Sequence, residues 1–175
     1  MIPKNRPRLT TKGIVVLGLL GALMFGAQVV MAPLPNIEPV SLLVMVYTVV
    51  FGLQALYPIY TFVLLECLIY GINLWTINYL YVWAILAVFV WFLRRMDNVL
   101  GWAILSAAFG LAFGALCAIV SLFIGGWQFA LTWWISGIPF DALHCVGNFF
   151  MALVLFKPCR KVLTMLSQQA GLMKT

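Results

Sequence analysis

Charged side chains are scarce in this sequence. Only 8% of its 175 residues are Asp, Glu, Lys or Arg, whereas 65% are hydrophobic. One soluble core of this size could not bury so much apolar surface, so lipid must cover the excess. Because a helix needs roughly 20 apolar residues to cross a hydrocarbon layer of about 30 Å, the chain has room for five to seven spans and for no separate soluble domain.

The sequence also lacks the usual signs of metal and catalytic chemistry. It contains a single histidine, and its cysteines stand alone, with no CxxC pair. We interpret them as small packing residues and expect no metal site and no cofactor. A pairing of Ser136 with His144 is conceivable, but there is no nucleophile elbow and no second base, so no catalytic residue is expected. An internal repeat, typical of secondary transporters, is absent as well.

The ten basic residues occupy only three places. They lie before the first apolar run, in the middle of the chain and after the last run: Lys4, Arg6, Arg8 and Lys12; Arg94 and Arg95; Lys157, Arg160, Lys161 and Lys174. The positive-inside rule produces this distribution. A nucleic-acid-binding surface would instead show a basic face with interleaved aromatic residues, so no nucleic-acid partner is expected.

Turn-forming stretches divide the apolar sequence into six expected transmembrane helices. These cover residues 13–32, 40–53, 56–72, 79–93, 99–123 and 139–155, between basic cytoplasmic tails 1–12 and 156–175. With the amino end in the cytoplasm, six crossings put the 94–98 loop and the carboxyl end on the same side. The links 33–39, 73–78 and 124–138 are then external, and they contain no Lys or Arg. We therefore expect an all-α, single-domain bundle with both termini in the cytoplasm.

Polar side chains gather toward the expected outer side. Glu66 lies at membrane depth, where an ionisable group is costly without a partner and is therefore a functional candidate, although a structural polar pairing would also explain it. Asp141, His144 and Asn148 are spaced by three and four and share one helical face. A lone histidine is more often a packing residue, but this combination favours binding. Gln28 adds an amide at similar depth.

The predicted pocket is open to the outside and has aromatic walls. Outer tryptophans ordinarily form an interfacial belt, but some can stack on a ring-bearing ligand. The expected substrate-binding residues are Gln28, Asn36, Glu38, Glu66, Asn73, Trp75, Trp133, Trp134, Asp141, His144 and Asn148.

Two expected spans carry small residues at four-residue spacing. One stripe is Gly18, Ala22 and Gly26, with Gly21 beside it, and the other is Ser106, Gly110 and Gly114. Such stripes let helix backbones approach closely in lipid. Each stripe predicts either packing within the chain or a docking face for another membrane subunit.

Two stretches and the overall pattern resemble a known family. Residues 134–148 (WISGIPFDALHCVGN), running into a helix that ends near Pro158, and residues 34–41 (LPNIEPVS) look like parts of the substrate-capture subunits, or S components, of energy-coupling factor (ECF) vitamin transporters. The likeness covers nearly the whole chain, from the basic amino end through six spans to the polar external pocket.

The resemblance implies a division of labour in a bacterial plasma membrane. S components bind a vitamin or related micronutrient from outside and hydrolyse nothing themselves. They dock through the first span onto a transmembrane coupling subunit that carries two cytoplasmic ATPases, and they are thought to topple to release the substrate inward. The family's docking motif of two alanines four apart corresponds here to Gly18 and Ala22, with Gly21 and Gly26 on the same span. The pocket is compatible with cobalamin, riboflavin or another ring-bearing vitamin, and we favour a cobalamin-like or other ring-bearing ligand.

Two other functions remain open at this point. One is a small membrane interaction or assembly subunit without a ligand, in which Asp141, His144 and Glu66 merely pair with one another. The other, less favoured, is an intramembrane enzyme.

Overall fold

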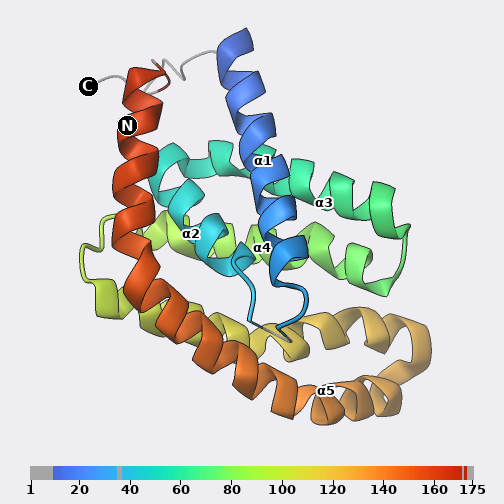
Figure 1. Ribbon diagram of the computed structural model, residues 1–175. Coiled ribbons are helices and arrows are strands. Elements are labelled where there is room, and N and C mark those ends of the chain that lie inside the picture. The colour runs from blue at the N-terminus through green and yellow to red at the C-terminus, as the bar shows by residue number, and fades with distance from the viewer. Residues whose placement is uncertain (1–9, 35–36, 171, 173–175) are drawn as a thin grey trace, which may run out of the picture.

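The chain folds into helices throughout its described part. The computed structural model describes residues 10–34, 37–170 and 172, and every regular element in these ranges is helical (Figure 1). The elements are α1 (Thr11–Met31), α2 (Val40–Phe51), the 3₁₀ turn η1 (Gly52–Ala55), α3 (Leu56–Tyr70), α4 (Leu74–Leu93) and α5 (Val99–Gln169). The predicted all-α class is confirmed.

Within the described ranges, four helical stretches are long and apolar enough to cross a membrane. They are Thr11–Met31, Val40–Tyr70, Leu74–Leu93 and Val99–Gln169. The second joins α2 to α3 through η1, and the fourth is the whole of α5. Their length and apolar character support the membrane-embedded class of protein that the composition predicts.

Helix α5 reverses its direction at one glycine. Gly126 has non-helical dihedral angles (φ 74°, ψ −172°) and divides α5 into a first arm, residues 99–125, and a second arm, residues 127–169. The Gly114 amide donates to Asp141 Oδ1 at 3.0 Å, and Asn148 Nδ2 donates to the Ser106 carbonyl at 3.3 Å. Because the residue number falls on one arm as it rises on the other, the arms are antiparallel (Figure 1).

The expected loop at 124–138 is therefore wrong. Residues 127–138 belong to the second arm, which also extends past the expected end at 155 to Gln169 and contains Pro139 and Pro158. Tryptophans and paired glycines indicated a long turn, but a single residue with positive φ is enough to reverse the chain, and glycine adopts that conformation without a Cβ penalty.

Helix α4 begins five residues earlier than expected. The Asn73 side chain accepts from the amides of Trp75 and Thr76, and Thr76 Oγ1 accepts from the Asn73 amide at 2.8 Å. This reciprocal capping satisfies amide groups that the first turn leaves free. The polar residues of 73–78, predicted to form a link, therefore start the helix.

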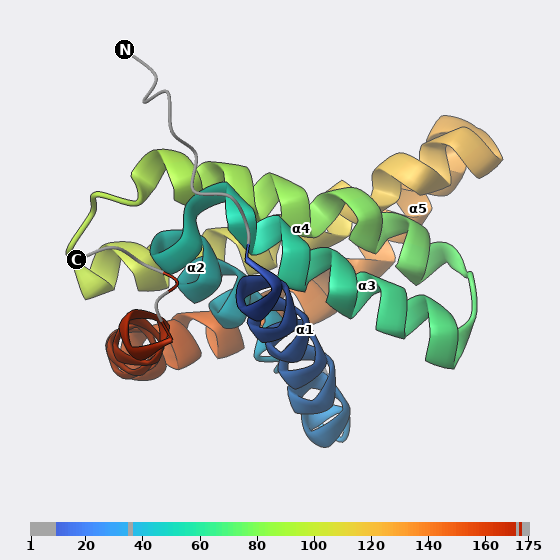
Figure 2. The same cartoon turned by 90° about the horizontal axis from the view of Figure 1, so that it is seen from above.

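The core lies around α2 and α4, whereas α1 lies at the edge. Trp83 of α4 is almost fully buried and contacts the rings of Phe62, Tyr79, Phe109 and Phe113. Helix α1 packs mainly on α3, across which it runs (Figures 1 and 2), and several of its apolar side chains face away from the protein: Ile14, Leu19, Leu23 and Val30. One apolar face of α1 therefore has no neighbour among the residues that the structure describes.

Two side-chain contacts mark opposite ends of the molecule. At one end Arg160 Nη1 lies 3.2 Å from Asp97 Oδ1, which joins the second arm to the α4–α5 link. At the other end the rings of Trp75 and Trp133 lie 6.0 Å apart and join the start of α4 to the region of the α5 reversal. Figure 1 shows the end of α5 on the same side of the molecule as the link between α4 and α5.

Candidate functional site

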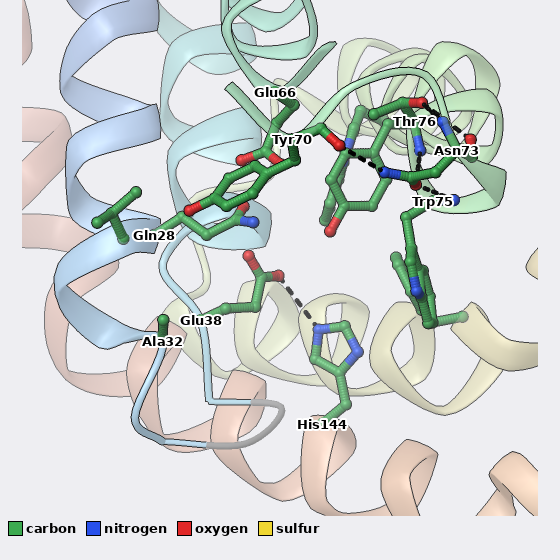
Figure 3. Close-up of a pocket in the computed structure, with 13 residues that line it drawn as sticks. Gln28, Ala32, Glu38, Glu66, Tyr70, Asn73, Trp75, Thr76 and His144 are labelled. Carbon is green, nitrogen blue, oxygen red and sulfur yellow. Dashed lines mark hydrogen bonds and ion pairs between the residues drawn. The ribbon is translucent and has the colours of Figure 1, made fainter. Parts of the chain in front are cut away.

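A cavity of about 520 Å³ lies where α1, α3, α4 and both arms of α5 converge (Figure 3). It is lined by Gln28, Val29, Ala32, Glu38, Glu66, Tyr70, Asn73, Trp75, Thr76, Tyr79, Trp83, Phe113 and His144. Tyr70 and Trp75 are 54% and 48% exposed and form its rim, whereas Glu66 and Trp83 are 6% and 1% exposed and lie at its depth. The volume is typical of a small-molecule site.

Glu38 lies on the cavity wall with both carboxylate oxygens engaged. Its Oε2 accepts from the Val40 amide at 2.9 Å, and its Oε1 accepts from the Ser41 amide and hydroxyl at 3.3 and 2.9 Å. The carboxylate thus caps the free amide groups at the start of α2, where the helix dipole also favours negative charge. His144 Nε2 lies 3.2 Å from the same Oε1 (Figure 3).

The hydrogen bonds continue below Glu38 into α5. Asn148 Nδ2 lies 3.1 Å from Ser41 Oγ and also donates to the Ser106 carbonyl. His144 and Asn148 therefore tie the beginning of α2 to both arms of α5. Both side chains are buried, as their shared helical face predicts.

Asp141 lies on the same helical face, but it links the two arms of α5 and does not line the cavity. Its Oδ1 accepts from the Gly114 amide, and a Cβ at position 114 would overlap the carboxylate. Its Oδ2 is buried and has no hydrogen-bond partner in the described chain, but Asp141 does not line the cavity. The structure thus separates Asp141 from the His144 site.

The opposite side of the cavity carries polar atoms without partners. Gln28 Oε1, Glu66 Oε1 and Trp83 Nε1 are buried, line the cavity through their residues and make no hydrogen bond within the described chain. Figure 3 shows Glu66 and Gln28 extending toward the space that faces Glu38 and His144. Unpaired polar atoms of this kind are costly to bury, so they point to a missing hydrogen-bonding partner.

Aromatic rings form much of the remaining wall. Tyr79 and Trp83 lie 5.4 Å apart, edge to face, and Tyr70 is held by Phe25 at 6.2 Å. Trp75 is supported from behind by Trp133. These rings give the cavity apolar faces on which a planar ligand could stack.

The structure brings six of the eleven predicted binding residues to the cavity. They are Gln28, Glu38, Glu66, Asn73, Trp75 and His144. Trp133 contacts Trp75 without lining the cavity, Trp134 is 40% exposed and lies apart from it, and Asn148 bonds beneath it. Asn36 lies outside the described residues.

Sequence reasoning missed seven lining residues: Val29, Ala32, Tyr70, Thr76, Tyr79, Trp83 and Phe113. Aromatic residues within an apolar helix resemble ordinary core, and periodicity cannot tell a ring that faces a cavity from one that faces a neighbour. A signal was available for Tyr79 and Trp83, which lie on one face of α4 with Thr76 at spacings of three and four.

The two small-residue stripes have different surroundings. On α1, an added Cβ at Gly18 or Gly26 would meet nothing within 4 Å and Ala22 is exposed, whereas a Cβ at Gly21 would strike Thr61 and the Pro58 carbonyl of α3. On α5, Gly110 lies against the backbone of His144 and Cys145. The α5 stripe therefore packs within the chain, and the α1 stripe is open apart from Gly21.

No lysine or arginine side chain is among the residues that line the cavity. In the described part of the chain, no group of three or more His, Cys, Asp or Glu side chains could hold a metal ion. The cavity offers carboxylate, amide, imidazole and indole groups between aromatic walls, a donor set for an organic ligand.

No family model, curated protein or solved structure matches this chain. Its function therefore has to be inferred from the cavity and from the distribution of charge.

Proposed function

We propose that this chain is the substrate-capture subunit of an ATP-driven micronutrient transporter, of the S-component type. The supporting observation is the cavity, in which Gln28 Oε1, Glu66 Oε1 and Trp83 Nε1 are buried between aromatic walls without partners in the described part of the chain. A chain that needed these groups only for packing would gain by pairing or replacing them. A bound ligand supplies the missing partners.

The proposed topology has six spans with both termini in the cytoplasm. The six spans are α1, α2, α3, α4 and the two arms of α5. The Arg160–Asp97 contact supports a common basic end for the α4–α5 link and the carboxyl-terminal region. Cytoplasmic retention of these cations leaves the cavity rim, with Tyr70 and Trp75, on the outer side of a bacterial plasma membrane.

The proposed partner is a transmembrane coupling subunit that carries two cytoplasmic ATPases. The open face of α1, with Gly18, Ala22 and Gly26, suits the close approach of another helix. Gly21 packs against α3 and therefore belongs to the internal packing of the chain.

The two alternative functions receive less support from the contacts. His144 pairs with Glu38, and Asp141 accepts from Gly114, so neither occupies the free oxygen of Glu66 as the ligand-free alternative requires. Ser136 is exposed and donates to the Trp133 carbonyl, which gives the hydrolytic alternative no activated serine.

Mass spectrometry of the purified full chain tests the capture function. The protein in detergent is expected to release one small organic compound in near-stoichiometric amount when it is denatured, and Trp83→Phe is expected to reduce the amount retained by removing the indole donor. Trp91→Phe is the matched control, because Trp91 lies on the same helix outside the cavity. Equal retention by all three proteins would refute the proposal, and so would the release of no compound together with a failure of the ligand-free protein to bind any small organic probe.

Substitution of the open α1 stripe tests the partner. Gly18→Leu with Ala22→Leu is expected to abolish co-purification with the coupling subunit and uptake by cells, while ligand retention stays intact. Leu19→Ala, also on an exposed position of α1, is the control that changes side-chain volume beside the stripe. Undiminished co-purification of the doubly substituted chain would count against this docking face.

A further inference from the structure

The cavity lining has more acidic groups than basic groups. Among the described residues, the lining contains the carboxylates of Glu38 and Glu66 and, as a possible cation, only the imidazole of His144. His144 is engaged with Glu38 at 3.2 Å, and Glu38 also accepts from the start of α2. With both carboxylates ionised, at least the charge on Glu66 has no counterion, whichever protonation state His144 takes.

Glu66 is the group whose surroundings call for a partner. The residue is buried to more than nine-tenths, its Oε1 has no hydrogen-bond partner among residues 10–34, 37–170 and 172, and its side chain faces the cavity beside Gln28 (Figure 3). An unpaired carboxylate in low-dielectric surroundings is unstable unless a cation or strong donor approaches it.

The neighbouring aromatic rings also favour a positively charged ligand. Tyr70, Tyr79, Trp75 and Trp83 line the cavity around Glu66 and Gln28. The negative faces of aromatic rings attract cations and disfavour anions. Trp83 Nε1 adds one donor for an acceptor atom elsewhere on the ligand.

We infer that the captured compound is an organic cation, a ring-bearing molecule with a quaternary or protonated nitrogen that lies against Glu66 and between the aromatic walls. This inference rests on the proposed capture function and narrows its substrate class. Anionic ligands find no lysine or arginine in the lining to pair with. The cavity of about 520 Å³ suits a compound of one or two small ring systems better than a cobalamin-sized macrocycle.

The charge of the released compound gives the first test. Denaturation of the full-length protein purified in detergent is expected to release a compound that is positively charged at neutral pH. A neutral or anionic compound would overturn the inference while leaving the capture function standing. If no compound is released and none of the probes below binds, both the inference and the capture function fail.

Three probes that share one pyridine ring provide the second test: the N-methylnicotinamide cation, neutral nicotinamide and the nicotinate anion. Tryptophan fluorescence titration of ligand-stripped protein is expected to show the cation binding at least about tenfold more tightly than the other two. Glu66→Gln keeps the shape of the side chain and should remove this preference, whereas Asp97→Asn, at the opposite end, should keep it. Nicotinate binding as tightly as the cation, or an unchanged preference in Glu66→Gln, would overturn the inference.

Discussion

The two sides of the cavity differ in whether their polar side chains have hydrogen-bond partners. On the α5 side, His144 and Asn148 each hold partners, and through Glu38 and Ser41 they fix the start of α2. On the side formed by α1, α3 and α4, Gln28, Glu66 and Trp83 each carry a buried polar atom that no described residue hydrogen-bonds. The comparison suggests that the first side maintains the shape of the site and the second side recognises what enters it.

The largest expected effect comes from separating the two arms of α5. An added Cβ at Gly110 lies 2.9 Å from backbone atoms of His144 and Cys145, so Gly110→Leu should lower the free energy of unfolding by about 3 kcal/mol. Gly18→Leu, where nothing lies within 4 Å, should have little effect. Denaturant titration in detergent micelles would measure the unfolding free energy of both variants. Equal stability would show that the packing of the two α5 arms does not maintain the shape of the site.

A smaller loss is expected when the bonded network is broken. Asn148→Leu removes the donors to Ser41 Oγ and to the Ser106 carbonyl and should cost about 2 kcal/mol of unfolding free energy. The matched control is Ser106→Ala, because Ser106 Oγ is buried nearby without a partner and its removal should change stability by less than about 0.5 kcal/mol. Similar losses in both variants would show that Asn148 does not hold the network together.

The two cavity carboxylates give the smallest and most discriminating effect. Glu38→Gln replaces an oxygen that accepts hydrogen bonds at the start of α2 and should lower the unfolding free energy by about 1 kcal/mol. Glu66→Gln should leave the unfolding free energy of ligand-free protein unchanged or raise it, because no hydrogen bond is lost at Glu66 Oε1 and an unpaired buried charge is removed. The same titration measures both variants. A larger loss of unfolding free energy from Glu66→Gln than from Glu38→Gln would show that Glu66, and not Glu38, has the structural role.

Much of the fold could be read from local patterns. The apolar runs predicted helices at 40–53 and 56–72, and in the structure both begin at the predicted residue and end two residues earlier, at Phe51 and Tyr70. The region after Phe123 could not be read this way, because tryptophans and glycines are compatible both with a turn and with an apolar helix. Only the conformation of Gly126 decides that the chain reverses once and continues as a helix.

The sequence predicted several residues of the candidate site, but it did not predict which of these side chains contact one another. Isolated polar residues in apolar sequence are conspicuous, so Gln28, Glu38, Glu66 and His144 could be selected. Spacing along one helix also grouped Asp141 with His144, but it cannot show that Asp141 meets Gly114 across the hairpin. Cross-helix distances depend on how the arms pack.

The amino-acid sequence by itself determined that this protein is helical, apolar enough for a membrane, and asymmetric in where it places its cations, because composition and charge order do not depend on folding. Tertiary structure decided which polar atoms are satisfied. A carboxylate that caps α2 and one that faces the cavity without a hydrogen-bond partner among the described residues are the same residue type, and only the packing of the helices separates Glu38 from Glu66.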